Sequence, residues 1–246
     1  GEYGEYIGGL VGSLWALAGV TLFYEALRFQ RTELRMQRHE LELQRHEIIE
    51  QTEQSKRQNE MIEVQTFENT FFNLLSLHTE IVETIELEVR DYEQDSEEGQ
   101  KKFTGRDCFV EYYQIFKKVF NYSFEKVTPE DFSSDSMKML VEYSFRVFFE
   151  EHQANLGHYF RTLFTLFNFI DQSNLKNKDF YISLSLSQLS NFELVLLYFH
   201  GLSDKNRAFK PIIEKYSLLY QVPEDELVDI TKDIYDENAF KIYHEE

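Results

Sequence analysis

The sequence predicts an all-α protein in which an N-terminal transmembrane helix continues into a long heptad-patterned helix and then into a helical bundle domain. The first observation is an uncharged apolar stretch at residues 7–24. The second is a seven-residue repeat that begins at Leu27. The third is a helical spacing of apolar residues from Phe67 onwards, in a chain with only 3 Pro and 10 Gly to interrupt helices. We assign residues 1–24 to a transmembrane segment, 25–66 to a stalk and 67–246 to a cytoplasmic all-helical domain with an acidic C-terminal tail.

Charge and residue usage exclude several functional classes. The formal net charge is −19, from 25 Lys and Arg against 44 Asp and Glu. Such an acidic protein repels phosphate backbones, so we expect no general nucleic-acid binding. Cys108 is the single cysteine, which excludes an internal disulfide and a Cys-based zinc site and fits a reducing cytosol. His39 and His46 lie one heptad apart because the repeat copies QRHE. We expect no metal and no cofactor.

Residues 7–24 are long enough to cross a membrane. These 18 residues span about 27 Å as a helix, which matches a hydrocarbon core. Four arginines follow the segment: Arg28, Arg31, Arg35 and Arg38. The positive-inside rule therefore places the C-terminal side, and with it most of the chain, in the cytoplasm. A cytoplasmic start would require another membrane helix before Gly1, and we expect one.

Small residues recur along this segment. Gly8, Gly12 and Ala16 lie at i, i+4 and i+8, a ridge that permits close contact with another helix in lipid. The alternative is a buried helix of a soluble protein. Apolar residues on every face and the arginines that follow favour the membrane.

The stalk carries an apolar residue at the first heptad position and glutamine at the fourth. Position a holds Leu27, Leu34, Leu41, Ile48, Ser55 and Ile62, and position d holds Gln30, Gln37, Gln44, Gln51, Gln58 and Gln65. Positions a and d share one face, so the pattern predicts a homo-oligomer with a partly polar seam. Glutamine at every d position disfavours a tight dimeric zipper and favours a higher oligomer or packing on a neighbouring helix. The alternative is a solvated spacer helix stabilised by charge pairs.

The domain divides into helices separated by turn-forming clusters. An apolar stripe from Phe67 predicts a core-facing helix that ends near Tyr92, followed by a charged loop at 93–102. We place further helices at 106–121, 136–152, 154–171, 178–188, 191–201, 206–220 and 223–235, with a short helical turn at 128–131.

Two local patterns lie near residue 190. Ser190 and Glu193 form a capping box that begins the helix at Asn191. Residues 182–189 alternate with serine at period two, as in a strand. Because no second strand is available to pair with them, we expect a helix there.

A polar strip in the helix at 154–171 is the first candidate site. Asn155, His158 and Arg161 follow one another at intervals of three on a helix otherwise rich in Phe and Leu. The strip can meet polar residues of other helices, namely Glu68, His78, Glu193 and His200. One interpretation is a site for a ligand or a phosphate group. The other is a satisfied buried polar network that fixes helix packing.

Arg146 and His152 form the second candidate site. Their spacing resembles the Arg-x4–6-His motif of helical RNases similar to HEPN domains, which implies that Arg146 holds phosphate and His152 acts in acid–base chemistry on the ribose 2′-hydroxyl. Val147 replaces the polar residue usual after the arginine, and Glu150 and Glu151 repel RNA.

Several stretches resemble the AbiC-like family of phage abortive infection proteins. They are Phe67–His78, Gly105–Arg106 with Phe109, Leu156–Arg161, Gln188–Leu194 and Lys210–Tyr216. The Gly-rich membrane segment that runs into a Gln-rich helix is also similar to that family, whose members typically carry two N-terminal membrane helices. The resemblance covers nearly all of the chain except the acidic tail. It implies host suicide or growth arrest during phage infection, and it supplies no established catalytic residues.

We therefore expect a membrane-anchored antiphage protein without enzymatic activity that oligomerises through its membrane and stalk helices. Its cytoplasmic domain would sense a phage-derived or host trigger, and the stalk would couple that domain to the inner membrane. Two alternatives stay open. One is an RNase toxin that uses Arg146 and His152, and the other is a membrane scaffold that recruits another defence effector.

Overall fold

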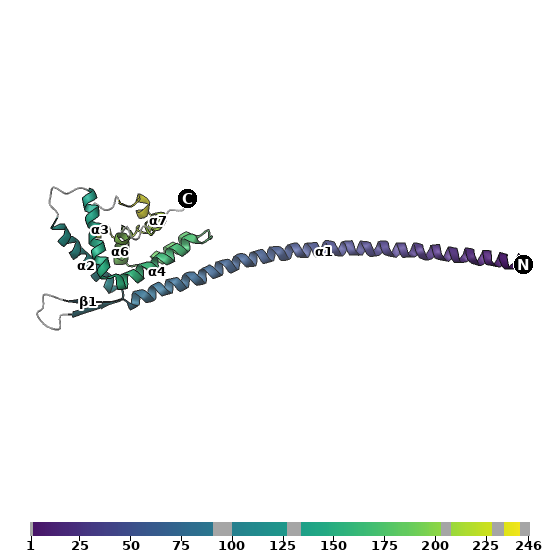
Figure 1. Cartoon of the computed structure of the whole chain (residues 1–246), viewed down its shortest axis with the longest axis horizontal. Coiled ribbons are helices and arrows are strands. Elements are labelled where there is room, and N and C mark those ends of the chain that lie inside the picture. The colour runs from purple at the N-terminus through teal and green to yellow at the C-terminus, as the bar shows by residue number, and fades with distance from the viewer. Residues whose placement is uncertain (1, 91–99, 127–133, 203–207, 228–233, 242–246) are drawn as a thin grey trace. The chain divides into compact units, whose positions relative to one another are not determined.

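The chain forms two compact units, Gly1–Glu63 and Val64–Glu246. The computed structural model describes residues 2–90, 100–126, 134–202, 208–227 and 234–241. We call Val64–Glu246 the body and describe each unit by itself. Apart from one hairpin and short turns, the described elements are helices (Figure 1).

The first unit is helical from Glu2 onwards and belongs to α1 (Glu2–Thr84). Apolar side chains between Ile7 and Tyr24 are exposed on every face of the helix. The hydroxyls of Ser13 and Thr21 donate hydrogen bonds to carbonyl oxygens of the preceding turn, at 2.8 Å in both cases. By length and composition, α1 is one helix that is able to cross a membrane. Its polar groups are satisfied within the helix, as a lipid environment requires.

The stalk face is uncovered within this unit. Leu34, Leu41 and Ile48 of heptad position a are all more than half exposed. A helix whose apolar seam faces water gains nothing from the hydrophobic effect until that seam meets a partner. The predicted self-association stays a prediction.

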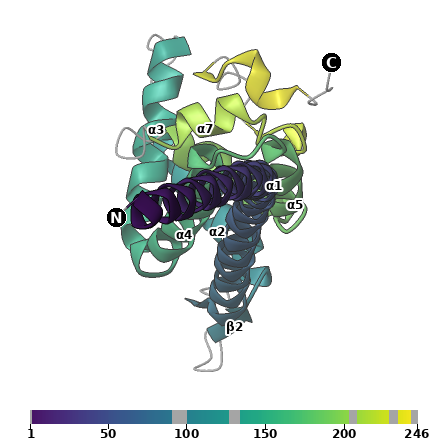
Figure 2. The ribbon, with the colours of Figure 1, turned by 90° about the vertical axis from the view of Figure 1, so that its right-hand side faces the viewer.

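The body contains the C-terminal part of α1 and the elements that follow it. These are β1 (Glu86–Arg90), β2 (Gln100–Thr104), α2 (Asp107–Phe124), α3 (Ser134–Glu151), α4 (Gln153–Gln172), α5 (Lys178–Leu186), α6 (Asn191–Leu202), α7 (Lys210–Lys215) and the 3-10 turns η3 (Glu224–Glu226) and η5 (Glu237–Phe240). Helix α6 contacts α2, α3 and α7, and α4 contacts α3, α5 and α7. Figure 2 labels α2, α3, α4, α5 and α7 of the body.

The predicted end of the first helix near Tyr92 was wrong, because α1 ends at Thr84 and an antiparallel hairpin follows. Strands β1 and β2 pair with Glu86 opposite Thr104. From Ile85 the sequence alternates, so that Ile85 and Leu87 are buried while Glu86 is exposed, and this period of two suits a strand. Lys102 reinforces the pairing with an ion pair to Glu86 at 2.7 Å. The all-α prediction is confirmed, since this hairpin is the one strand pair among the described elements. Residues 93–99 of the expected loop lie outside the described residues.

The helix predicted at residues 182–189 is confirmed from Ile182 to Leu186, which belong to α5.

The helix predicted at 206–220 is much shorter, since α7 ends at Lys215. Ser217 has a φ of 52°, and Leu218 N–H donates to the carbonyl of Ile213 at 3.1 Å. This left-handed residue with its return bond is a C-terminal helix stop that commonly uses glycine.

Two further helical predictions have mixed outcomes. Of the helix expected at 223–235, the structure describes a 3-10 turn at Glu224–Glu226 and leaves residues 228–233 outside the described part. The helical turn expected at 128–131 also lies outside the described residues.

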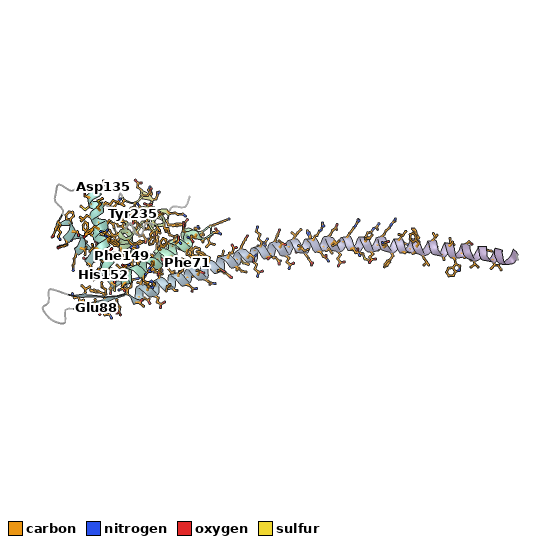
Figure 3. The ribbon with its side chains drawn as sticks, in the orientation of Figure 1. Phe71, Glu88, Asp135, Phe149, His152 and Tyr235 are labelled. Atoms are coloured by element: carbon orange, nitrogen blue, oxygen red, sulfur yellow. The ribbon has the colours of Figure 1, made fainter. Side chains whose placement is uncertain are left out.

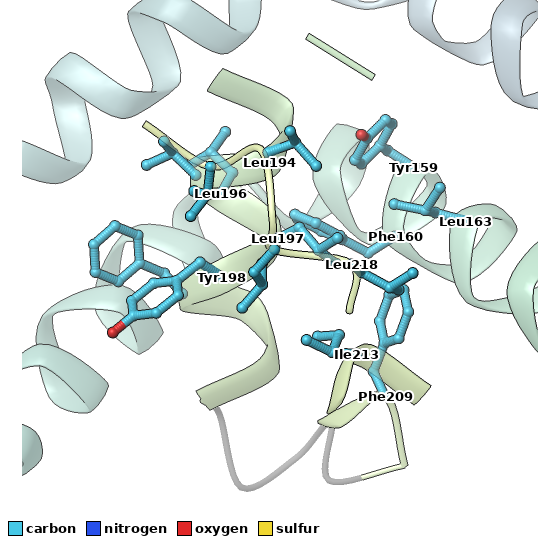
Figure 4. Close-up of a cluster of buried hydrophobic side chains, with 14 of the residues drawn as sticks. Tyr159, Phe160, Leu163, Leu194, Leu196, Leu197, Tyr198, Phe209, Ile213 and Leu218 are labelled. Atoms are coloured by element: carbon cyan, nitrogen blue, oxygen red, sulfur yellow. The ribbon is translucent and has the colours of Figure 1, made fainter. Parts of the chain in front are cut away.

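Helix α6 is the centre of the body. Every residue from Glu193 to Leu202 is buried. The bent pair of α5 and α6 also passes a length-and-composition test for a membrane span, with a bend of 114°. Helix α6 is buried on all faces, so its apolar composition is explained by core packing. Figure 4 shows side chains of α4 and α6 gathered with Phe209 and Ile213 in this core.

Gly201→Ala tests the packing at the end of α6. A Cβ at Gly201 would overlap the Tyr235 hydroxyl and lie 2.7 Å from Cδ1 of Ile213. We expect the free energy of unfolding in urea to fall by about 1–3 kcal/mol, because the core must shift to admit the methyl group. In the matched control Gly157→Ala, the Cβ would meet Gln153 Cγ at 3.4 Å. That helical site should tolerate alanine or gain up to about 1 kcal/mol. Equal effects of the two substitutions would contradict this packing.

Candidate functional site: the Tyr159 cluster

A buried carboxylate lies where α4 meets the start of α6. Glu193 is 0% exposed, and its Oε1 accepts a hydrogen bond from the Tyr159 hydroxyl at 3.1 Å. Its Oε2 accepts a hydrogen bond from the backbone N–H of Ser190 at 2.8 Å. The Glu193 N–H in turn donates to Ser190 Oγ at 3.4 Å, which completes the capping box. Glu193 therefore caps the start of α6 and also accepts a hydrogen bond from a tyrosine of α4.

His78 of α1 packs against the same tyrosine. The centroids of the two rings are 5.1 Å apart, and His78 is only 2% exposed. Burial, followed by the positive charge of Arg106, lowers the pKa of His78 to about 4. The imidazole is thus neutral at pH 7, and its Nε2 has no hydrogen-bond partner in the described part of the chain. A buried polar atom without a partner makes this the least satisfied position of the site.

Arg106 completes the arrangement from the junction of β2 and α2. Its guanidinium donates to the carbonyl oxygen of Gln188 at 2.8 Å, just before α6. Burial, followed by the charge of Glu193, raises the pKa of Tyr159 well above its ordinary value, so its hydroxyl stays protonated as a donor. We call His78, Arg106, Tyr159, Gln188, Ser190 and Glu193 the Tyr159 cluster. It joins α1, the hairpin junction, α4 and the α5–α6 turn.

The other residues of the predicted polar strip lie apart from the Tyr159 cluster. Asn155 donates from Nδ2 to the carbonyl of Glu86 at 3.0 Å and contacts the Tyr112 hydroxyl at 3.2 Å. His158 is exposed and lines an open pocket of about 290 Å³ beside the end of α1. Arg161 is exposed and donates from Nε to its own helix. Each interval of three residues turns the helix by about 300°, so the side chains drift around α4. Asn155 still lines the same pocket as His158, whereas Arg161 does not.

Two more residues expected beside that strip also lie elsewhere. Glu68 accepts a hydrogen bond from the Tyr181 hydroxyl at 2.9 Å. The ring of His200 stacks on Phe160 with centroids 3.8 Å apart, and burial lowers the pKa of His200 to about 3. Of the predicted set, the structure therefore brings only His78 and Glu193 to one tyrosine. Whether these residues bind a ligand or only fix packing stays a prediction.

Arg146 and His152 lie in unlike surroundings at the end of α3. The His152 ring lies 5.1 Å from the rings of both Tyr112 and Phe148, and burial lowers the pKa of His152. Figure 3 labels His152 within the body. Its Nε2 is enclosed. Arg146 is exposed and lies over the Tyr143 ring at 5.4 Å. The enclosed Nε2 is not placed to exchange a proton with a ribose hydroxyl, so this arrangement favours packing over acid–base chemistry at that atom.

Sequence reasoning missed Tyr159 and the bond from Arg106. In the sequence, Tyr159 is one large residue in an apolar stripe. A buried tyrosine hydroxyl normally requires a hydrogen-bond partner. That partner is 34 residues away in sequence, and no local spacing reveals it. Among the described residues, no group of three or more His, Cys, Asp or Glu side chains is placed to hold a metal ion.

Residues 151–227 match the model of a family described as "Putative phage abortive infection protein". This match confirms the predicted resemblance over that part of the chain, which contains Tyr159, Gln188 and Glu193. No curated protein and no solved structure matches the chain.

Tyr159→Phe tests the bond at the centre of the cluster. Removing the hydroxyl leaves Oε1 of the buried Glu193 without this donor, so we expect a loss of about 1.5–3 kcal/mol in the free energy of unfolding. Tyr143→Phe is the matched control, because Tyr143 is half exposed and should change stability by less than about 0.5 kcal/mol. Urea unfolding followed by circular dichroism measures both variants. Equal stability of Tyr159→Phe and wild type would show that the bond contributes nothing.

Proposed function

We propose that this protein is a membrane-anchored bacterial abortive infection protein whose body responds to a phage-derived or host trigger. The observation that carries the proposal is the family match over residues 151–227, which holds the centre of the Tyr159 cluster. In this proposal the chain acts without catalysis. It oligomerises through its membrane and stalk helices, and its output is a disturbance of the inner membrane or growth arrest.

Membrane anchoring is supported by the chemistry of α1. Residues 7–24 carry no charge, and their apolar side chains are exposed on every face of the helix. Burying such a surface in lipid stabilises it by the hydrophobic effect, whereas water would leave it unfavourably hydrated. The arginines from Arg28 onwards then face anionic headgroups of the cytoplasmic leaflet, with the body on the same side.

The contacts of α1 inside the body support a route by which a trigger could act on this helix. Phe67 and Phe71 of α1 contact the Tyr181 ring at 4.9 and 5.1 Å, and His78 contacts Tyr159. A trigger that repacks the Tyr159 cluster would therefore act on α1 itself. The sequence from Gly19 to Gly99 contains neither Pro nor Gly between these two positions, so it lacks residues that would form a hinge.

The experiment is a phage challenge of cells that express the full chain, with protection measured by plaque counts and survival. Leu14→Arg/Leu17→Arg should abolish protection and release the protein from membranes in alkaline extraction, because each buried charge costs about 2.5–3.5 kcal/mol at the membrane centre. Leu14→Ile/Leu17→Ile is the matched control and should behave as wild type. Absence of protection by wild type against a broad phage panel would contradict the proposal.

The same challenge separates this proposal from RNA cleavage. Arg146→Ala removes the phosphate-binding group that the RNase alternative requires, and Arg146 is exposed enough to change without unfolding the body. We expect protection to be fully retained. Loss of protection with unchanged protein level and circular dichroism would instead favour RNA cleavage.

A further inference from the structure

The stalk carries opposite charges on the two flanks of its seam. With Leu27 at position a, position e holds Arg31, Arg38 and Arg45, while position g holds Glu33, Glu40 and Glu47. All six side chains are exposed on α1. In a coiled coil, positions e and g lie on opposite sides of the a/d face and meet the neighbouring helix. One flank of the seam is therefore positive and the other negative.

The glutamates on the negative flank have no basic neighbour within their own helix. Charged residues on a helix pair at i±3 or i±4, and these neighbours of Glu33, Glu40 and Glu47 are apolar residues, glutamines or a further glutamate. The arginine five residues later, such as Arg38 after Glu33, lies about 140° around the helix and points elsewhere. In the described part of the first unit, the recorded ion pair joins Arg28 to Glu25 at 3.6 Å.

We propose that the stalk over Leu27–Glu47 binds further copies of itself in parallel, with Glu33 and Glu40 of one copy paired to Arg38 and Arg45 of the next. In a parallel coiled coil, a residue at position g of one helix lies beside the residue at position e, five residues later, of the neighbouring helix. Each positive flank then meets the negative flank of a neighbour, in a pair or in a larger closed ring. The inference rests on the self-association included in the proposed function and adds its orientation and register.

The same charges disfavour the antiparallel arrangement. Two antiparallel copies would place arginine against arginine along the e flanks and glutamate against glutamate along the g flanks. The membrane sets the register, because residues 7–24 of every copy must lie at the same depth. In that register each glutamine at position d faces its own equivalent, where one amide donates and the other accepts.

The seam continues into the membrane segment in the same register. Counting back from Leu27, positions a and d fall on Phe23, Val20, Ala16, Ser13 and Gly9; the last three are small residues. A Cβ at Gly9 would meet nothing within 4 Å in this chain, so packing within the chain does not require glycine there. Small residues on this face permit close approach of a second helix in lipid.

Cysteine cross-linking of the full chain in detergent tests orientation and register. Gln37→Cys and Gln44→Cys should each cross-link to themselves on oxidation, because equivalent d positions face one another in a parallel seam. His39→Cys, at the outward f position, is the matched control and should cross-link at least about tenfold more slowly. Wild type supplies the background, since its Cys108 is 0% exposed. Failure of both d-position variants to cross-link overturns the inference.

Charge exchange tests the proposed pairs. Glu33→Arg/Glu40→Arg and Arg38→Glu/Arg45→Glu each make both flanks alike, so association should weaken about tenfold or more in analytical ultracentrifugation. The fourfold variant restores every pair with reversed sign and should return to within about threefold of wild type. Unchanged association of the double variants, or no recovery in the fourfold variant, overturns the pairing. A strictly monomeric wild type removes the oligomer of the proposed function as well, whereas an oligomer without d-position cross-links removes only this inference.

Discussion

The structure of the body depends on the burial of the C-terminal part of α1 among its helices. Phe67 stacks on Phe169 with ring centroids 4.8 Å apart, and Phe71, Ile81 and Val82 are almost completely buried. Burying a side chain of this size stabilises a fold by about 1.5–3 kcal/mol. Without these residues, the aromatic surfaces of α4 and α5 would face water. The long N-terminal helix is therefore also a structural part of the body.

The Tyr159 cluster adds specificity to that apolar packing. A buried carboxylate is tolerated only where hydrogen bonds replace its water, and Glu193 obtains them from Tyr159 and the Ser190 backbone. His78 extends the contact to α1, with an imidazole that burial keeps neutral. Its Nε2 lacks a partner in the described chain, so a movement of the His78 side chain breaks no hydrogen bond at that atom. The cluster is thus a place where α1 meets the segment matched by the abortive infection family.

The sequence predicted most of the helices but only part of the site. The stalk has a heptad repeat, and α2, α3, α4 and α6 have apolar stripes with a period near 3.6 residues. Both are local patterns, so the sequence alone predicts these helices. The hairpin was not predicted, because the alternation from Ile85 covers too few residues to separate from the end of a helix. Helix α7 is short because Ser217 adopts a left-handed backbone conformation. Serine gives no sequence signal for that conformation. The contact of Tyr159 with Glu193 is tertiary and has no local signature.

The dependence of the body on α1 is tested most directly by two fragments that differ only in residues 64–84. The account predicts that fragment 64–246 unfolds in urea with one cooperative transition. Fragment 85–246, which lacks Phe67, Phe71 and His78, should show no such transition and should bind a hydrophobic dye strongly. A cooperative transition of equal midpoint in fragment 85–246 would contradict the account, because the body would then fold without α1.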